Sequence, residues 1–287
     1  MRWRGREGST NIEDRRGMGP PARVGAVGCG GLVLVLVLSW LTGADPMQLL
    51  ALLGEGGGGA GLTEPEQAPA TGAVPQDELG QFASVVLRDT EMTWSQFLGG
   101  GGYQPPRLVL FDQAVRSACG FTSAAVGPFY CPPDRTVYLD LSFFDEMSRR
   151  FGAEGDFAAA YVIAHEVGHH VQNLTGLSEQ VQGLQQRASP EDSNALSVML
   201  ELQADCLAGV WGHHANTERQ LIEPGDFEEG LRAASAIGDD ALQRGSGGAV
   251  RPESWTHGSS AQRSQWLRRG LETGDPRSCD TFEKAGL

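Results

Sequence analysis

Residues 156–176 read DFAAAYVIAHEVGHHVQNLTG, and this stretch joins a helical apolar pattern to the motif HExxH at positions 165–169. Its apolar or small residues recur every three or four positions, at Phe157, Tyr161, Ala164, Gly168 and Val171. Asp156 is available as an N-cap, and Gly176 lies near the expected end. The pattern therefore predicts a helix that carries the motif.

The two histidines of the motif, His165 and His169, lie four residues apart. On a helix such residues share one face, one turn apart, so both neutral imidazoles can bind one zinc ion. Glu166 is offset by one residue, which places it where a general base can take a proton from a metal-activated water. The alternative is a pair of core or surface histidines that bind no metal.

A third zinc ligand is expected from a second helix, because catalytic zinc takes three protein ligands and keeps one open position. Residues 189–192, SPED, carry an N-cap and a proline at the first helical position, and they predict a long helix to about Gly212. On this mostly apolar helix Glu201 and Asp205 lie four residues apart, and buried carboxylates need partners. We expect Glu201 to bind zinc and Asp205 to accept a hydrogen bond from a ligand imidazole. The alternative is an exposed acidic stripe.

Four further histidines are weaker candidates. His170 follows the second motif histidine, but one helical step rotates it about 100 degrees away, so we expect no bond to the metal. His213 and His214 lie at the far end of the second helix, where a helix C-terminus favours partly charged imidazole. His257 is isolated and precedes Arg263 by six residues. Either these two donate to the oxyanion of a tetrahedral intermediate, or His257 caps a helix.

The N-terminal region has the charge pattern of a membrane protein. Residues 1–23 carry six arginines, and residues 24–43 carry no charged residue. We therefore predict a cytoplasmic basic tail over 1–23, a transmembrane helix over 24–43 and the remainder outside the cytoplasm. Residues 44–78 are rich in glycine, proline, alanine and acidic residues, and they predict a flexible linker. A cleavable signal peptide is the alternative, with a small-residue site at 42–44.

The chain of 287 residues has a formal net charge of -14, and its acidic part lies after the basic start. An acidic surface repels phosphate backbones, so we predict that nucleic acid is not a partner.

Beyond Cys29 the chain has four cysteines, which can pair in three ways or serve as zinc ligands. No CxxC spacing is present, which favours disulfides or buried thiols. We expect Cys119 to pair with Cys131, and Cys206 with Cys279.

Between the linker and the motif helix, the pattern predicts one helix and two strands. Residues 79–98 have near-helical apolar spacing, with a possible break at positions 89–90. Residues 107–111 and 136–141 are short runs of β-branched or aromatic residues flanked by turn-forming prolines, and they predict strands.

Longer segments resemble one known family. They are the start MRWRGR, GPFYCPPD at 127–134, HEVGHH at 165–170, ELQADCLAGVW at 201–211 and THGSSAQR at 256–263. Over nearly its whole length the chain is similar to the YpfJ-like neutral zinc metallopeptidases of bacterial membranes. This resemblance implies a zinc peptidase of the bacterial inner membrane.

The chain also resembles, more distantly, the membrane gluzincins typified by the CAAX prenyl protease. In those enzymes HExxH is followed by an ExxxD helix, and then by a histidine with an arginine six residues later. This resemblance implies Glu201 as the third ligand, Asp205 as its support, and His257 with Arg263 as transition-state stabilisers. Gly258 stands where those enzymes usually have proline, which leaves the geometry of this turn open.

Together these patterns predict a mostly helical α+β, zincin-like metallopeptidase domain over residues 79–287, with a small β-sheet and one preceding transmembrane helix. We expect a membrane-anchored zinc endopeptidase that acts on protein or peptide substrates outside the cytoplasm and contacts the lipid bilayer through its single span. The strand at 137–141 is expected to pair with extended substrate. Two other functions stay open: a membrane-tethered zinc-binding scaffold, and a metal-dependent amidase acting on cell-wall peptides.

Overall fold

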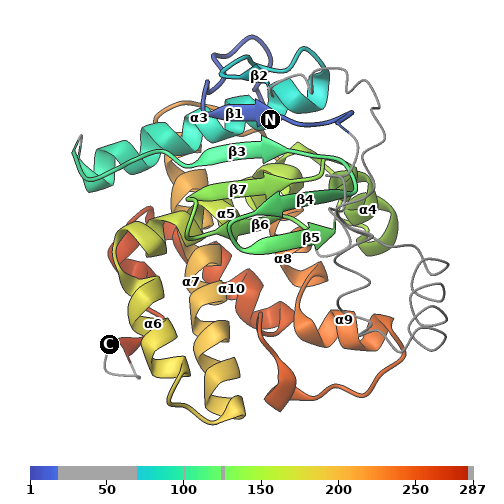
Figure 1. Cartoon of the computed structure of the whole chain (residues 1–287), viewed down its shortest axis with the longest axis vertical. Helices are drawn as coiled ribbons and strands as arrows, with labels where there is room; N and C mark the ends of the chain where they lie inside the picture. The colour runs from blue at the N-terminus through green and yellow to red at the C-terminus, as the bar shows by residue number, and fades with distance from the viewer. Residues whose placement is uncertain (19–69, 100, 124–126, 284–287) are drawn as a thin grey trace, which may run out of the picture. The chain divides into compact units, whose positions relative to one another are not determined.

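A five-stranded sheet with the order β2-β1-β3-β7-β6 lies at the centre of the fold (Figure 1). Its strands are β1 Ile12–Asp14, β2 Ala70–Thr71, β3 Arg107–Leu110, β6 Phe129–Cys131 and β7 Thr136–Leu139. β1, β3 and β7 run parallel, whereas β2 and β6 pair antiparallel at the two edges. The computed structural model describes residues 1–18, 70–99, 101–123 and 127–283.

The two faces of the sheet pack against different partners because side chains alternate along a strand. The residues that enter the main core with the helices are Leu108, Leu110, Val137 and Leu139. On the opposite face, Val109, Phe111 and Tyr138 form a smaller cluster with Val115. Val115 belongs to a separate hairpin of β4 Ala114–Ser117 and β5 Gly120–Ser123. Both predicted strands, 107–111 and 136–141, are confirmed.

Helices make up most of the described chain. They are α3 Glu78–Leu98, α4 Ser142–Phe151, α5 Asp156–Leu174, α6 Leu177–Gln185, α7 Pro190–Thr217, α8 Asp226–Ala236, α9 Asp239–Gly245 and α10 Ser260–Thr273, with short 3-10 turns at Pro252–Ser254 and Pro276–Cys279. The prediction of a mostly helical α+β fold with a small sheet is confirmed.

The predicted break in the first helix does not occur. Asp89 and Thr90 stay helical because their side chains have partners inside the fold. The Thr90 hydroxyl donates to the carbonyl of Leu87 at 2.7 Å, and the Asp89 carboxylate accepts from Trp211 and Arg219 at 2.8 Å. α3 is therefore one helix of 21 residues.

The two motif helices begin close to their predicted starts. Ser189 caps α7, since its side chain accepts a hydrogen bond from the Asp192 amide. α7 runs past Gly212 to Thr217. Asp156 is not the cap of α5 but its first helical residue, and Gly155 occupies the cap position.

Both expected disulfides are present. Cys119 pairs with Cys131, and their Cα atoms lie 5.9 Å apart. Cys206 pairs with Cys279 at a Cα separation of 5.5 Å, and both of these residues are buried. The first disulfide joins the β4–β5 hairpin to β6, and the second joins α7 to the C-terminal 3-10 turn.

The single-pass membrane topology predicted from the sequence is wrong. The predicted span, residues 24–43, lies outside the described residues, and no described helix combines the length and apolar composition that a bilayer crossing requires. One crossing would also place residues 1–23 and the main domain on opposite sides of a membrane. Instead Met1–Met18 belongs to the same compact unit as Pro69–Leu287, and β1 pairs with β3 along residues 12–14. The inner-membrane location and the lipid bilayer as a partner are accordingly not supported.

The prediction that the strand at 137–141 pairs with substrate is also wrong. β7 lies between β3 and β6, so both of its edges are already hydrogen-bonded within the sheet. β6 is the edge strand on that side.

Candidate metal centre

α5 brings the two motif histidines to one face, and their ring centroids lie 4.7 Å apart. Gly168, between them, lets α7 pack closely against this helix. A Cβ atom at that position would lie 3.0 Å from the carbonyl oxygen of Ala204 and 3.1 Å from its Cα. The small residue thus allows side chains of α7 to reach the histidines.

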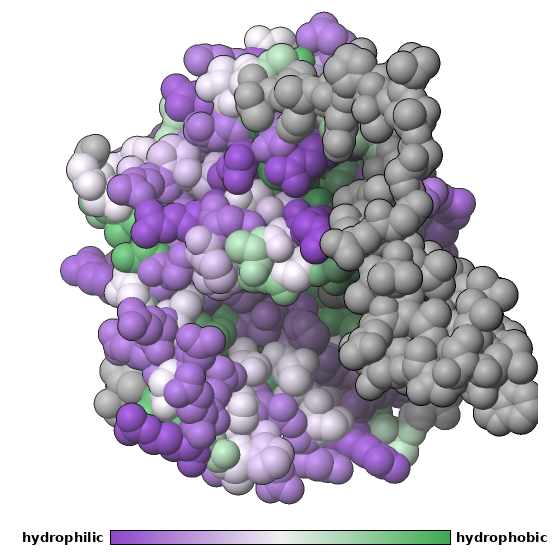
Figure 2. Space-filling view, viewed as in Figure 1, coloured by the Kyte–Doolittle hydropathy of each residue, from purple (hydrophilic) through white to green (hydrophobic). Residues whose placement is uncertain are grey.

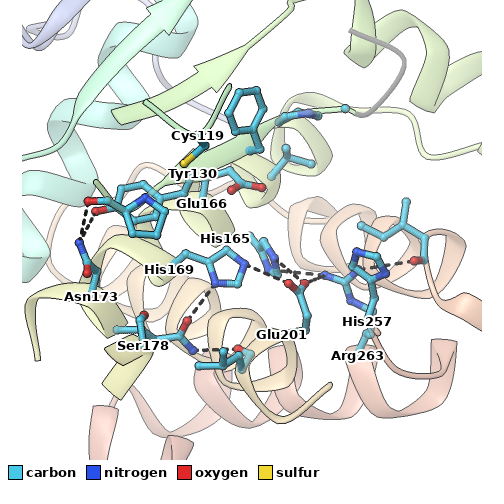
Figure 3. A pocket seen from close by; sticks show the side chains of 18 of the residues that line it. Cys119, Tyr130, His165, Glu166, His169, Asn173, Ser178, Glu201, His257 and Arg263 are labelled. Atoms are coloured by element: carbon cyan, nitrogen blue, oxygen red, sulfur yellow. Dashed lines mark hydrogen bonds and ion pairs between the residues drawn. The ribbon is translucent and has the colours of Figure 1, made fainter. Parts of the chain in front are cut away.

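Glu201 of α7 meets both imidazoles (Figure 3). Its Oε2 lies 3.2 Å from His165 Nε2, and its Oε1 lies 3.3 Å from His169 Nε2. One ligand atom from each residue lies within 4.8 Å of the other two. Tetrahedral zinc with bonds of about 2.0–2.1 Å separates neighbouring ligand atoms by about 3.3 Å, so this spacing suits the ion.

The hydrogen bonds of the imidazoles leave both Nε2 atoms free for a metal. His165 Nδ1 lies 2.9 Å from Asp205 Oδ1, and His169 Nδ1 lies 2.9 Å from Gln172 Oε1. These oxygens accept, so each Nδ1 carries the hydrogen, and Nε2 of the neutral ring turns its lone pair toward Glu201. His165 Nε2 and Glu201 Oε2, 3.2 Å apart, can share a hydrogen bond, and a zinc ion bound among the three donor atoms takes the place of that proton. The donor set therefore fits zinc.

The protonation states of the residues around the centre also suit a bound cation. Burial alone would lower the pKa of His165, but Asp205 and Glu201 raise that pKa to about 10. Burial alone would raise the pKa of Glu201, but His169 and His165 hold that pKa well below its usual value. Glu201 is thus a carboxylate, the form that binds metal.

Glu166 lies beside the cluster on the same helix and lines the same cleft. Its side chain is buried, and this burial raises the pKa of the carboxyl group, although His169 and His165 oppose the shift. A raised pKa suits a carboxylate that receives and returns a proton.

Asp205 contacts His165 on the side of the ring away from Glu201, with Oδ1 2.9 Å from Nδ1. It is fully buried and also accepts from Tyr161 Oη at 2.5 Å. Arg263 donates to the same carboxylate through Nε at 2.8 Å and Nη2 at 2.9 Å. The sequence pattern did not single out Tyr161 for the site, because an aromatic residue at a core position of a helix looks the same whether or not its hydroxyl has a role.

Arg263, which was predicted to act on the transition state together with His257, lines the cleft and also bonds to groups inside the protein. Its side chain is 3% exposed, and Nη2 also donates to Tyr161 at 3.2 Å. Nη2 lies 3.9 Å from Glu201 Oε2. Through these bonds Arg263 can support Asp205.

His257 lines the cleft (Figure 3). It lies on the side of the metal centre that is farther from α6. Asp239 organises the whole turn that carries it. Asp239 Oδ2 accepts from the backbone amides of Thr256, His257 and Gly258 at 2.7–3.0 Å. Asp239 Oδ1 lies 3.1 Å from His257 Nδ1, and this hydrogen bond raises the pKa of the imidazole. The sequence pattern did not single out Asp239, because eighteen residues separate it from His257.

The remaining histidines have structural partners, as expected. His213 Nδ1 and His214 Nε2 bond to carbonyl oxygens at the end of α10, those of Leu271 and Gly274. His170 is fully buried and bonds to Gln104 and Tyr130. Burial lowers the pKa of His170 to about 4.

The centre lies in a cleft of about 1180 Å³. β6, α5, α6, α7 and the His257 turn contribute to its walls. In the space-filling view the surface is recessed between the region of β5 and β6 and the helices α6 and α7 (Figure 2). Such a volume exceeds that of a usual small-molecule pocket, about 300–1,000 Å³.

Comparison with known proteins places the chain in a family. The family model described as "Putative neutral zinc metallopeptidase" matches residues 1–282. The chain belongs to this family. The family implies zinc, and the cluster of His165, His169 and Glu201 is where the ion would bind.

The chain is also similar to curated bacterial proteins. The chain is 47% identical to the uncharacterized protein YpfJ of Escherichia coli K12 over 294 residues, which cover 99% of the chain and 100% of the relative. It is 46% identical to the uncharacterized protein Rv2575 of Mycobacterium tuberculosis over 208 residues, which cover 69% of the chain and 68% of the relative. No solved structure matches the chain. The expected likeness to the CAAX prenyl protease is not shown by these comparisons.

Proposed function

We propose that this member of the family is a zinc-dependent endopeptidase. His165, His169 and Glu201 hold the ion, and Glu166 is the general base. The observation that carries the proposal is the convergence of three suitable ligand atoms within 4.8 Å, beside a buried carboxylate, in a cleft large enough for a peptide.

Zinc bound there would polarise the scissile carbonyl and lower the pKa of a water molecule to about 7. The residues of the chain supply the proton transfer. Glu166 takes the proton from the attacking water and delivers it to the nitrogen of the leaving amine. Its burial raises its pKa, which makes Glu166 a stronger base for the first of these transfers.

His257 donates to the oxyanion that develops on the attacked carbonyl. Support for this role comes from its place in the cleft and from Asp239, whose bond to Nδ1 directs Nε2 away from the turn. Asp239 and Arg263 act as positioning residues, the first for His257 and the second for Asp205 and hence His165.

An extended protein segment suits the cleft better than a small molecule. β6 is an edge strand, and Phe129 and Tyr130 on it line the cleft. An edge strand can add an extended peptide by backbone hydrogen bonds. This places the substrate backbone between β6 and the metal face of α5.

The test compares purified full-length protein with three variants, Glu166→Gln, Glu201→Ala and His257→Phe. We measure bound zinc and cleavage of unfolded casein and of cell-wall peptides. Glu166→Gln keeps zinc and loses about 100-fold or more in kcat, because only the base is lost. Glu201→Ala loses zinc. His257→Phe keeps zinc and loses about 100-fold in kcat.

Other outcomes would replace the proposal. Zinc-loaded wild type that cleaves neither substrate would support the zinc-binding scaffold. Cleavage confined to the cell-wall peptides would support the amidase. Full activity of Glu166→Gln would show that Glu166 is not the general base.

A further inference from the structure

His170 directly follows a metal ligand, yet its ring is turned away from the centre and is fully buried. Its Nε2 lies 2.6 Å from the carbonyl oxygen of Gln104. A carbonyl only accepts, so Nε2 carries the hydrogen and Nδ1 is the acceptor. The Tyr130 hydroxyl, 2.9 Å from Nδ1, therefore donates to His170.

Asn173, one helical turn beyond His169, reaches the same hydroxyl. Its Nδ2 donates to Tyr130 Oη at 2.9 Å and to the carbonyl oxygen of Pro132 at 3.3 Å (Figure 3). Two side chains of α5 thus hold one hydroxyl of β6. The rings of Tyr130 and His170 also meet edge to face, with centroids 5.4 Å apart.

These contacts link the two walls between which the substrate would lie. α5 carries two of the three proposed metal ligands, and β6 is the edge strand that lines the cleft. Among the strands of the sheet, β6 has the closest backbone packing against α5. The bonds at Tyr130 therefore help to set the distance from the substrate strand to the metal.

We propose that His170, Asn173 and Tyr130 are positioning residues that clamp β6 to the metal helix and so set how tightly an extended peptide binds. The proposal rests on the proposed function, since it assigns β6 to substrate. It follows from the geometry because a peptide paired with a strand moves with that strand, so a strand that is held less firmly binds the peptide less tightly.

Tyr130→Phe tests the clamp, because it removes the hydroxyl and keeps the ring. Tyr138→Phe is the matched control. Tyr138 lies on the neighbouring strand β7, and its hydroxyl donates to Asp134 at 2.8 Å without reaching α5. Both variants lose one phenolic hydrogen bond in the same sheet.

We measure KM and kcat on an unfolded protein substrate, bound zinc, and amide hydrogen exchange of residues 129–131 in the zinc-loaded protein. For Tyr130→Phe we expect KM to rise roughly fivefold, the worth of about one hydrogen bond, with kcat and zinc content within twofold of wild type. Exchange in β6 should accelerate. Tyr138→Phe should leave KM and β6 exchange near wild-type values.

Equal KM for Tyr130→Phe and wild type would overturn the clamp, whether or not exchange changes. An equal rise of KM in Tyr138→Phe would also overturn it, because the effect would then belong to the sheet as a whole. Failure of wild type to cleave any protein substrate would instead contradict the proposed function, so the two failures are distinguishable.

Discussion

Asp205 is the residue on which the geometry of the metal centre depends most. One fully buried carboxylate accepts hydrogen bonds from Tyr161, His165 and Arg263. It selects the tautomer of His165 and neutralises the buried guanidinium of Arg263. Burial would raise the pKa of Asp205, but Arg263 and His165 outweigh burial and lower it.

Asp205→Asn should weaken zinc binding by about 10- to 100-fold, as loss of a partner of a ligand histidine usually does. It should also lower the free energy of unfolding by about 3–5 kcal/mol, because Arg263 is left buried with only the more distant Glu201 as a counter-charge. Competition with a chelator and denaturant unfolding measure the two effects. Asp192→Asn, on the exposed first turn of the same helix, is the control. Unchanged zinc affinity in Asp205→Asn would contradict the role given to this residue.

At the scale of elements, glycines decide how closely the helices around the site approach. α7 crosses α10 at Gly209 and Gly270. A Cβ on Gly209 would lie 2.2 Å from the Leu267 carbonyl oxygen, and one on Gly270 would lie 2.0 Å from the Cys206 carbonyl oxygen. Backbone atoms cannot rotate away as a flexible side chain can. This contact holds Arg263 of α10 within reach of Asp205 of α7.

Gly209→Ala should lower the free energy of unfolding by about 3 kcal/mol, the upper part of the range for overpacking. Gly183→Ala is the matched control, because Gly183 is also helical but a Cβ there would meet nothing within 4 Å. The control should be neutral or stabilising by up to about 1 kcal/mol, since alanine favours helix more than glycine does. Denaturant unfolding measures both. Equal stability of the two variants would show that the helices can separate at little cost.

At the scale of the whole molecule, the N-terminal segment is part of the folded unit. Trp3 and Ile12 are buried in the main core, and β1 lies between β2 and β3. Arg16 extends this attachment, because its guanidinium bonds to Asp14 and to Asp77, the N-cap of α3. Any fragment that begins after this segment lacks a strand of the sheet.

Ile12→Ala should lower the free energy of unfolding by about 2–5 kcal/mol, the usual cost of removing a buried isoleucine side chain. Thr10→Ala, at an exposed position two residues away, should change it by no more than about 0.5 kcal/mol. Thermal or denaturant unfolding of the full chain measures the difference. If both substitutions were neutral, residues 1–18 would not contribute to the core.

The sequence alone determined the elements whose signal is local. Helical spacing predicted α3, α5 and α7, with a capping motif at the start of α7. Runs of β-branched or aromatic residues between turn-forming prolines predicted β3 and β7. His165, Glu166 and His169 were found because a helix places residues four apart on one face whatever surrounds it. Glu201 and Asp205 followed from the cost of burying carboxylates without partners.

Tertiary structure decided everything that depends on residues distant in sequence. The basic N-terminal segment has a charge pattern that suits a cytoplasmic tail, yet pairing with β3 makes it a strand, and strand pairing leaves little trace in three residues. The sequence did not predict the bonds of Arg263 to Asp205 and Tyr161, because these residues lie 58 and 102 positions away from it. Asp239 acquires a role only where the α8–α9 junction meets the His257 turn. The periodicity of a sequence indicates the face of the element on which a residue lies. The hydrogen bonds and charge state of that residue depend on the partner that tertiary packing places beside it.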